Sequence, residues 1–330
     1  MTAPLLELRD VRKEYRIGGG LGLVRRTVTA LDRVTLSIGA EKPTITALVG
    51  ESGSGKTTIA RLIMGLTEPT SGAVMYQGRS VREWVKSNEM AYRRQVQMIF
   101  QDPYSTYNPF YRVDRVLFST VKKFNLASSK DDARKIVLES MRRMGLRPEY
   151  ILGRYPHQLS GGERQRLMLC RILMIKPRLI VADEPVSMLD ASLRSIFLDN
   201  LMELRSSLQL SCLYITHDMN IANYVADDMV VMVHGSLMER GDARSVIREP
   251  LHPYSQLLVA SIPTPDPRKR WQDTLELKVS TLKELKPEVG CKFAPRCPYV
   301  MDVCRVEDPP LFEKDGRRVA CFLYDPRLAR

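Results

Sequence analysis

The chain has 330 residues, of which 44% are hydrophobic and 27% charged, a balance typical of a globular protein with room for a large core. Its formal net charge of +12 is compatible with nucleic acid, an anionic membrane surface or an acidic partner. No apolar run approaches the roughly 20 residues of a transmembrane helix, and the first residues lack the pattern of a secretory signal. We therefore expect a cytoplasmic protein whose charge is spread over a solvated surface.

The first quarter of the chain is predicted to begin with strands. Residues 5–11 start as a strand, and residues 28–38 alternate apolar and polar positions, which favours antiparallel strands. An apolar run at 44–49 predicts a buried strand, and residues 59–64 predict a helix. A glycine-rich segment joins this strand to this helix, and a further short strand is expected at 73–76.

The glycine-rich segment has the residue pattern of a phosphate-binding P-loop in its expected strand–loop–helix context. Its glycines let backbone N–H groups turn toward phosphate oxygens, and the helix N-terminus adds a partial positive charge. Lys56 can reach the β- and γ-phosphates, and the Thr57 hydroxyl can bind Mg²⁺. The predicted nucleoside triphosphate site consists of Gly50, Glu51, Ser52, Gly53, Ser54, Gly55, Lys56, Thr57 and Thr58.

A second pair of strands is predicted to carry polar groups at its ends. Residues 96–100 form a strand that ends at Gln101, and residues 178–184 form a buried strand that ends in Asp183 and Glu184. Asp183 would hold Mg²⁺ through water, and Glu184 would orient or deprotonate the attacking water. The helical pattern between these strands predicts a helical subdomain over residues 102–177.

Ser160, Gly161 and Gly162 open a predicted helix, with Ser160 as its N-cap. The exposed N–H groups of such a helix start form a second anion-binding surface. Because the P-loop already holds a triphosphate, this surface fits a nucleotide held by a partner chain. Farther along we expect a helix at 191–208, a strand ending at His217, and two strands on either side of a turn at 234–235.

With these motifs the chain resembles the ATP-binding cassette (ABC) ATPases. The features that carry the resemblance are the P-loop, the Leu-Ser-Gly-Gly segment, the Asp-Glu strand end, the strand-end glutamine and the late histidine. The resemblance implies that Tyr15 stacks on adenine, that Gln101 senses Mg²⁺ and couples to a transmembrane partner, and that Ser160–Gly162 close over ATP in trans. It also implies that residues 187–190, including Asp190, form the D-loop and that His217 contacts the γ-phosphate. Glu163 and Met188 depart from the usual glutamine and alanine.

The fold implied is an α/β P-loop NTPase, an ABC nucleotide-binding domain with a RecA-like core, an antiparallel β subdomain and a helical subdomain. We place this domain at residues 1–245 and a C-terminal module at 246–330, where proline becomes frequent. Segments 252–263 and 290–298, with 304–305, 309–310 and 319–321, resemble the corresponding part of oligopeptide/dipeptide importer ATPases.

Four of the six cysteines lie in this module, whereas Cys170 and Cys212 have apolar surroundings typical of a core. In a reducing compartment such a cluster favours a metal site over disulfides. The spacing is wider than in most zinc sites, and the resemblance implies a [4Fe–4S] cluster, with zinc as the alternative. The four residues are Cys291, Cys297, Cys304 and Cys321.

We therefore expect an ATPase subunit of an ABC importer, peripheral to the cytoplasmic side of the inner membrane. The implied partners are a second ATPase subunit, identical or paralogous, two transmembrane permease subunits and, indirectly, a solute-binding protein outside. An ABC ATPase acting on nucleic acid has only the positive charge in its favour, so no nucleic acid partner is expected. A regulatory subunit with little turnover is disfavoured by the intact Lys56, Asp183, Glu184 and His217. The sequence leaves the transported solute open, whether peptide or another small molecule.

Overall fold

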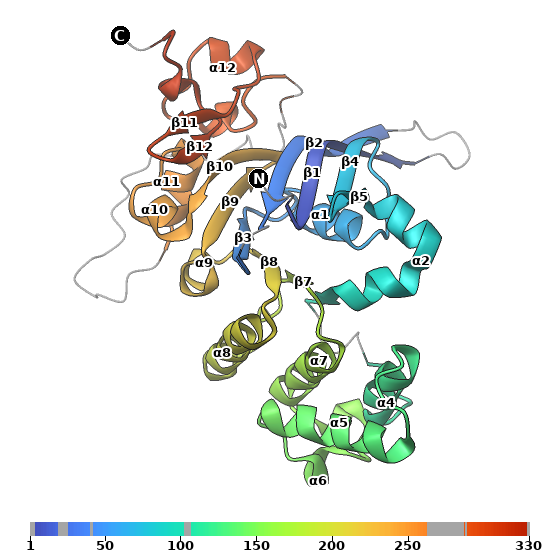
Figure 1. Cartoon of the computed structure of the whole chain (residues 1–330). Helices are drawn as coiled ribbons and strands as arrows, with labels where there is room; N and C mark the ends of the chain where they lie inside the picture. Colours follow the sequence, from blue (N-terminus) through green and yellow to red (C-terminus); the bar gives the residue numbers. More distant parts are fainter. Residues whose placement is uncertain are drawn as a thin grey trace, which may run out of the picture. The chain divides into compact units, whose positions relative to one another are not determined.

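The computed structural model describes residues 4–18, 26–39, 42–101, 107–262, 287 and 289–328 (Figure 1). It divides into two compact units, which are described separately. The first unit contains residues 1–5, 38–44 and 76–214, and the second contains 6–37, 45–75 and 215–330. None of the helices in the described ranges is long and apolar enough to cross a membrane.

The main sheet of the second unit is built around strand β9 (Asp228–Val233). Strand β3 (Ile45–Val49) pairs with β9 in parallel, with Thr46 opposite Asp228, and every residue of β3 is buried. A continuous apolar run is what a parallel strand covered on both faces requires. On its other edge β9 pairs antiparallel with β10 (Ser236–Asp242), which is followed across the sheet by β12 (Arg317–Val319) and β11 (Phe312–Lys314).

A second sheet in this unit contains the N-terminal strands in the order β2-β1-β4. Strand β1 (Leu6–Ile17) is longer than the predicted 5–11 and includes Tyr15. The region 28–38, where more than one strand was expected, forms the single strand β2 (Arg26–Ile38), and β4 (Ser71–Tyr76) includes the predicted 73–76. Both β1 and β2 alternate buried and exposed residues over part of their length, as expected for strands with one buried face.

In the first unit, β6 (Val96–Ile99) pairs in parallel with β7 (Leu179–Asp183), with Ile99 opposite Ala182. From residue 107 to the start of β7 the described chain is mainly helical, as predicted, and α8 (Ala191–Leu208) has the predicted bounds. Sequence reasoning missed helix α2 (Val81–Gln95), which leads into β6. The helices between the strands are α4 (Asp114–Lys123), α5 (Lys130–Arg143), α6 (Pro148–Ile151) and α7 (Gly161–Ile175). Strand β5 (Arg79–Ser80) precedes α2, and β8 (Ser211–Thr216) follows α8.

The C-terminal residues share a core with the P-loop strand. Val49 of β3 and Val231 of β9 belong to the same buried cluster as Cys291, Phe293 and Phe322. The helices of this region are α9 (Met219–Val225), α10 (Ala243–Arg248), α11 (Pro253–Ala260) and α12 (Val303–Val306). In the first unit Cys170, and on β8 Cys212, have no exposed surface, which confirms that they are core residues.

Candidate nucleotide-binding site

The P-loop joins β3 to helix α1 (Lys56–Ile63) in the second unit. Gly55 caps the start of α1 with φ of 99°, a conformation that strains any side chain. A Cβ at Gly55 would lie 2.7 Å from the carbonyl oxygen of Ala30, and one at Gly50 would lie 2.3 Å from that of Met232. Glycine at both positions therefore permits close backbone approach and leaves the loop's N–H groups at the helix start, where an anion binds.

The Lys56 side chain folds back over this loop. Its Nζ donates hydrogen bonds to the carbonyl oxygens of Gly50 (2.7 Å) and Glu51 (2.9 Å) and to Ser54 Oγ (3.3 Å). The residue is only 6% exposed, so loop oxygens replace the water that the ammonium loses. Thr57 is exposed. The loop thus combines a held positive charge with an exposed threonine, residue types that suit a phosphate and its Mg²⁺.

Two other predicted nucleotide residues of this unit lie outside the loop. Tyr15 is half-buried on β1, with the Lys13 Nζ 5.0 Å from its ring centre. The Tyr15 hydroxyl is buried and has no hydrogen-bond partner among the described residues. His217 is exposed and directly follows β8.

In the first unit the structure brings Gln101 and Glu184 together. The Gln101 Nε2 donates a hydrogen bond to Glu184 Oε2 over 3.1 Å. Asp183 is the last residue of β7 and is buried. Glu184 has φ of 44°, rare for a non-glycine residue, and its carbonyl oxygen accepts hydrogen bonds from the N–H and Oγ of Ser187 (3.2 and 3.0 Å). Neighbouring parallel strands end at the same edge, which explains the contact between Gln101 and Glu184.

The Leu-Ser-Gly-Gly segment starts helix α7 with a reciprocal cap. Ser160 Oγ accepts from the N–H of Glu163 (3.2 Å), and Glu163 Oε2 accepts from the N–H of Ser160 (2.7 Å). This capping box confirms Ser160 as the N-cap. It also gives a structural role in the cap to Glu163, which stands where the family usually has glutamine. Gly162 packs against Leu193 of α8, since a Cβ there would lie 2.9 Å from that side chain.

A further contact joins α7 to the segment that follows β7. Buried Gln165 of α7 donates through its Nε2 to the carbonyl oxygen of Pro185, next to Glu184. Asp190 caps α8, with its Oδ1 accepting from the N–H of Leu193 (3.0 Å) and from Ser192 Oγ (2.9 Å). The hydrogen bond from Leu193 lowers the pKa of Asp190, so its carboxylate is ionised at neutral pH.

In the second unit, all four C-terminal cysteines line one small cavity, together with His252. Cys291, Cys304 and Cys321 are buried, and burial raises the pKa of Cys291 to about 11 and that of Cys321 to about 12. No three cysteine, histidine or carboxylate side chains among the described residues converge as a site for a single metal ion. The thiols surround a common space instead.

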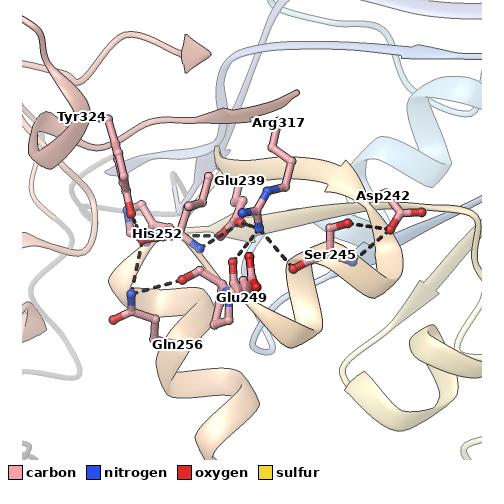
Figure 2. Close-up of polar contacts among 10 residues, drawn as sticks. Glu239, Asp242, Ser245, Glu249, His252, Gln256, Arg317 and Tyr324 are labelled. Atoms are coloured by element: carbon pink, nitrogen blue, oxygen red, sulfur yellow. Dashed lines mark hydrogen bonds and ion pairs between the residues drawn. The ribbon is translucent and has the colours of Figure 1, made fainter. Parts of the chain in front are cut away.

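A buried polar network attaches the chain's last strands to the sheet (Figure 2). Glu239 of β10 has no exposed surface, and its carboxylate accepts from the N–H groups of Leu251 (3.1 Å) and His252 (2.9 Å). Arg317 of β12 lies 3.5 Å from Glu239 Oε1 and donates to the carbonyl oxygens of Ser245 and Glu249. This buried charge pair therefore connects β12 with α10 and with the residues between α10 and α11.

Sequence reasoning missed the residues around Glu51. This acidic side chain lies in an anion-binding loop, which is itself a signal that a positive partner is needed. Arg296 provides one, through two hydrogen bonds of 2.9 and 2.8 Å to the Glu51 carboxylate. The separation of 245 residues between the two hides such a pair from any local pattern.

Comparison with known proteins agrees with these observations. Residues 31–187 match the ABC transporter family, and residues 238–304 match the C-terminal region of oligopeptide/dipeptide transporters. The di/tripeptide transport ATP-binding protein DppF of Pseudomonas aeruginosa is 39% identical over 319 residues, which cover 96% of this chain and 97% of that protein. The oligopeptide transport ATP-binding protein OppF of Escherichia coli is 34% identical, over 98% of this chain and 97% of that protein.

Two solved structures share the fold. The dimeric post-hydrolysis state of the ATP-binding cassette MJ0796, bound to ADP and Pi, is 26% identical with a TM-score of 0.62, over 72% of this chain and 99% of that one. The structure of cbiO1 from Clostridium perfringens, part of the ABC transporter complex cbiONQ, is 25% identical with a TM-score of 0.63, over 74% of this chain and 91% of that one. This chain has the α/β fold of an ABC cassette and belongs to the ATP-binding proteins of the oligopeptide/dipeptide ABC transporter family.

Proposed function

We propose that this chain powers the import of peptides by binding and hydrolysing ATP. The P-loop carries the proposal, because Lys56 and the N–H groups at the start of α1 meet the needs of a triphosphate. Thr57, Gln101 and Asp183 would hold Mg²⁺, and Tyr15 would stack on the adenine. Glu184 would activate the attacking water, with His217 at the γ-phosphate. The peptide cargo is suggested by the di/tripeptide and oligopeptide transport named for the relatives.

The working unit would be a pair of cassettes. Ser160–Gly162 and the D-loop residue Asp190 would close over the ATP bound to the partner's P-loop, and hydrolysis would reopen the pair. The dimeric state of the structurally similar cassette MJ0796 supports this arrangement. The pair would act on two permease subunits at the cytoplasmic face of the inner membrane, supplied by a solute-binding protein outside. Whether the second cassette is identical is decided by the mass of the ATP-bound complex.

Uptake of isotope-labelled peptides tests the transport function. A strain lacking this chain should lose uptake of at least one of a di-, a tri- and an oligopeptide. Wild-type chain should restore it, and a Lys56→Ala variant should not, although it is produced at the same level. Unchanged uptake of all three peptides in the deletion strain would overturn the proposal.

We further propose that Cys291, Cys297, Cys304 and Cys321 hold a metal centre in the module that we place at residues 246–330. The four thiols around one cavity fit a [4Fe–4S] cluster better than zinc, because a multi-iron cluster keeps its ligands farther apart than one ion does. When bound, the cluster would cross-link the module and stabilise its fold.

His252 adds a second observation at this cavity. Its Nδ1 accepts from the N–H of Tyr254 (3.0 Å), so the ring proton is on Nε2. That Nε2 is buried, lines the cysteine cavity with the rest of the ring, and has no partner among the described residues. Burial lowers the pKa of His252 to about 3, which keeps the ring neutral. The unpaired donor would be satisfied by a sulfur ligand of the cluster.

Anaerobic purification with iron, sulfide and zinc analysis and a visible spectrum decides between the metals. We expect iron and sulfide in equal amounts, together with a broad absorption band. If the protein contains zinc and no iron, the metal centre is a zinc site and the cluster is excluded. Cys297→Ser should lose the metal, whereas Cys170→Ala, at a buried cysteine of the other unit, should keep it. Wild-type protein that is isolated anaerobically in a folded state with neither iron nor zinc bound would overturn the proposal.

A further inference from the structure

The C-terminal residues reach the P-loop at Glu51, the second residue of the loop. Arg296 donates from Nη1 to Glu51 Oε2 (2.9 Å) and from Nη2 to Glu51 Oε1 (2.8 Å). This two-point geometry is the strongest form of a guanidinium–carboxylate pair. The Arg296 side chain is 22% exposed and that of Glu51 45%, so water screens the pair only in part.

The backbone of Glu51 is held as well. Its N–H donates to the hydroxyl of Tyr254 over 3.0 Å. Tyr254 has no exposed surface, and its ring packs against Phe293 with centres 5.3 Å apart. Phe293 also lies 5.5 Å from the Arg296 guanidinium. One compact group of C-terminal side chains therefore holds both the backbone and the carboxylate of Glu51.

This group is rigidly placed by the rest of the module. The His252 side chain is the N-cap of α11 and accepts a hydrogen bond from the N–H of Tyr254. This bond fixes the backbone of Tyr254 at the start of the helix. Arg296 ends the short 3₁₀ turn Ala294–Arg296, between Cys291 and Cys297. Phe293 and Cys291 are part of the core that includes Val49 at the end of the P-loop strand.

The Arg296–Glu51 contact matters for nucleotide binding because Glu51 is negatively charged. A carboxylate in a phosphate-binding loop repels the triphosphate unless a cation neutralises it. We propose that Arg296, with Tyr254, is a positioning clamp that neutralises Glu51 and holds the P-loop open for the nucleotide, so that the C-terminal module sets the affinity for ATP. This inference rests on the proposed function of the P-loop as an ATP site.

The test uses the full chain with Arg296→Ala, Glu51→Gln and the double variant. Arg296→Ala removes the two-point cation from the Glu51 carboxylate, so KM for MgATP should rise about fivefold, while kcat at saturating ATP stays within about twofold. Glu51→Gln removes the repelling charge and should have a smaller effect. The double variant should resemble Glu51→Gln, and the rise in KM for Arg296→Ala should shrink as salt is added.

Arg305→Ala is the matched control, because Arg305 is exposed and flanks Cys304 as Arg296 flanks Cys297. Its KM should equal that of the wild type. If Arg296→Ala only unfolds part of the sample, kcat falls and KM stays unchanged, which would overturn the clamp. A conservative Arg296→Lys variant keeps the charge without the two-point geometry and should show an intermediate KM.

Hydrogen exchange of the nucleotide-free protein separates this inference from the proposed function. Arg296→Ala should speed exchange in the peptide containing Glu51, and Arg305→Ala should not. If the wild type fails to bind ATP yet this exchange difference appears, Arg296 does hold the P-loop, and it is the ATP function, with any effect on ATP affinity, that falls. If ATP binds and both KM and exchange are unchanged in Arg296→Ala, the clamp is overturned.

Discussion

The amide of Gln101 donates a hydrogen bond to the carboxylate of Glu184 over 3.1 Å, although the two residues are 83 positions apart in the chain. Gln101 follows β6 and Glu184 follows β7, so the parallel pairing of these strands produces the contact. The bond holds one carboxylate oxygen of the proposed base and leaves the residue only half-buried. It thereby links the residue proposed to sense Mg²⁺ and couple to the permease with the residue proposed to activate water.

Glu184→Gln should abolish hydrolysis without abolishing ATP binding. The amide cannot accept a proton from water, and general-base catalysis contributes about 10²- to 10⁴-fold. We expect kcat to fall by at least about 100-fold, with ATP-bound protein eluting as a dimer in size-exclusion chromatography. Glu203→Gln, the same change at an exposed position of α8, is the control. Turnover that survives in Glu184→Gln would remove Glu184 from the mechanism.

Gln101→Glu should shift the pH dependence of ATP hydrolysis. The introduced carboxylate would lie beside Glu184, and the like charge raises the pKa of the pair. Because a base must be deprotonated to act, activity on the acidic side should be lost at a higher pH than in the wild type. Rates from pH 5.5 to 8.5 measure this shift. Gln101→Ala removes the hydrogen bond without adding charge and should leave the acidic limb in place; equal shifts in both variants contradict the argument.

Arg317→Met should destabilise the second unit strongly. Glu239 has no exposed surface, and loss of Arg317 leaves its charge buried without a cation. Breaking a buried pair in this way costs about 3–5 kcal/mol. Urea unfolding measures the loss. In the double variant with Glu239→Gln the charge is gone, while the amide oxygen can still accept from a neighbouring N–H, so much of the stability should return. Equal unfolding of the single and double variants would show that the charge is not the cause.

His252→Asn should keep the helix-capping role of the His252 Nδ1 and remove the proposed role of its Nε2. The asparagine oxygen can replace Nδ1 as acceptor for the N–H of Tyr254, so α11 keeps its cap. The Nε2–H that lines the cysteine cavity is lost. We expect unchanged helix content and thermal unfolding of the metal-free protein, together with faster loss of iron to a chelator. Equal rates of iron loss in variant and wild type would leave Nε2 without a role at the metal.

The elements nearest the proposed ATP site could be predicted because their signals are local. A buried strand followed by a glycine-rich loop and Lys56, or Ser160 followed by Glu163, fixes the backbone within a few residues. The spacing of apolar residues predicted the helical character of the segment between β6 and β7, and α8 has the bounds expected for it. Helix α2 was missed because its hydrophobic face is narrow, with only Val81 and Tyr92 buried.

The amino-acid sequence by itself determined that this chain carries a P-loop, an acidic strand end and a four-cysteine segment, since each depends on neighbouring residues. Only the tertiary structure decided what these pieces touch. The Arg296–Glu51 pair, the Glu239–Arg317 pair and the common core of Val49 and Phe293 join residues that are tens to hundreds of positions apart. Such contacts depend on how strands align and where buried charge finds a partner, which no short stretch of sequence records.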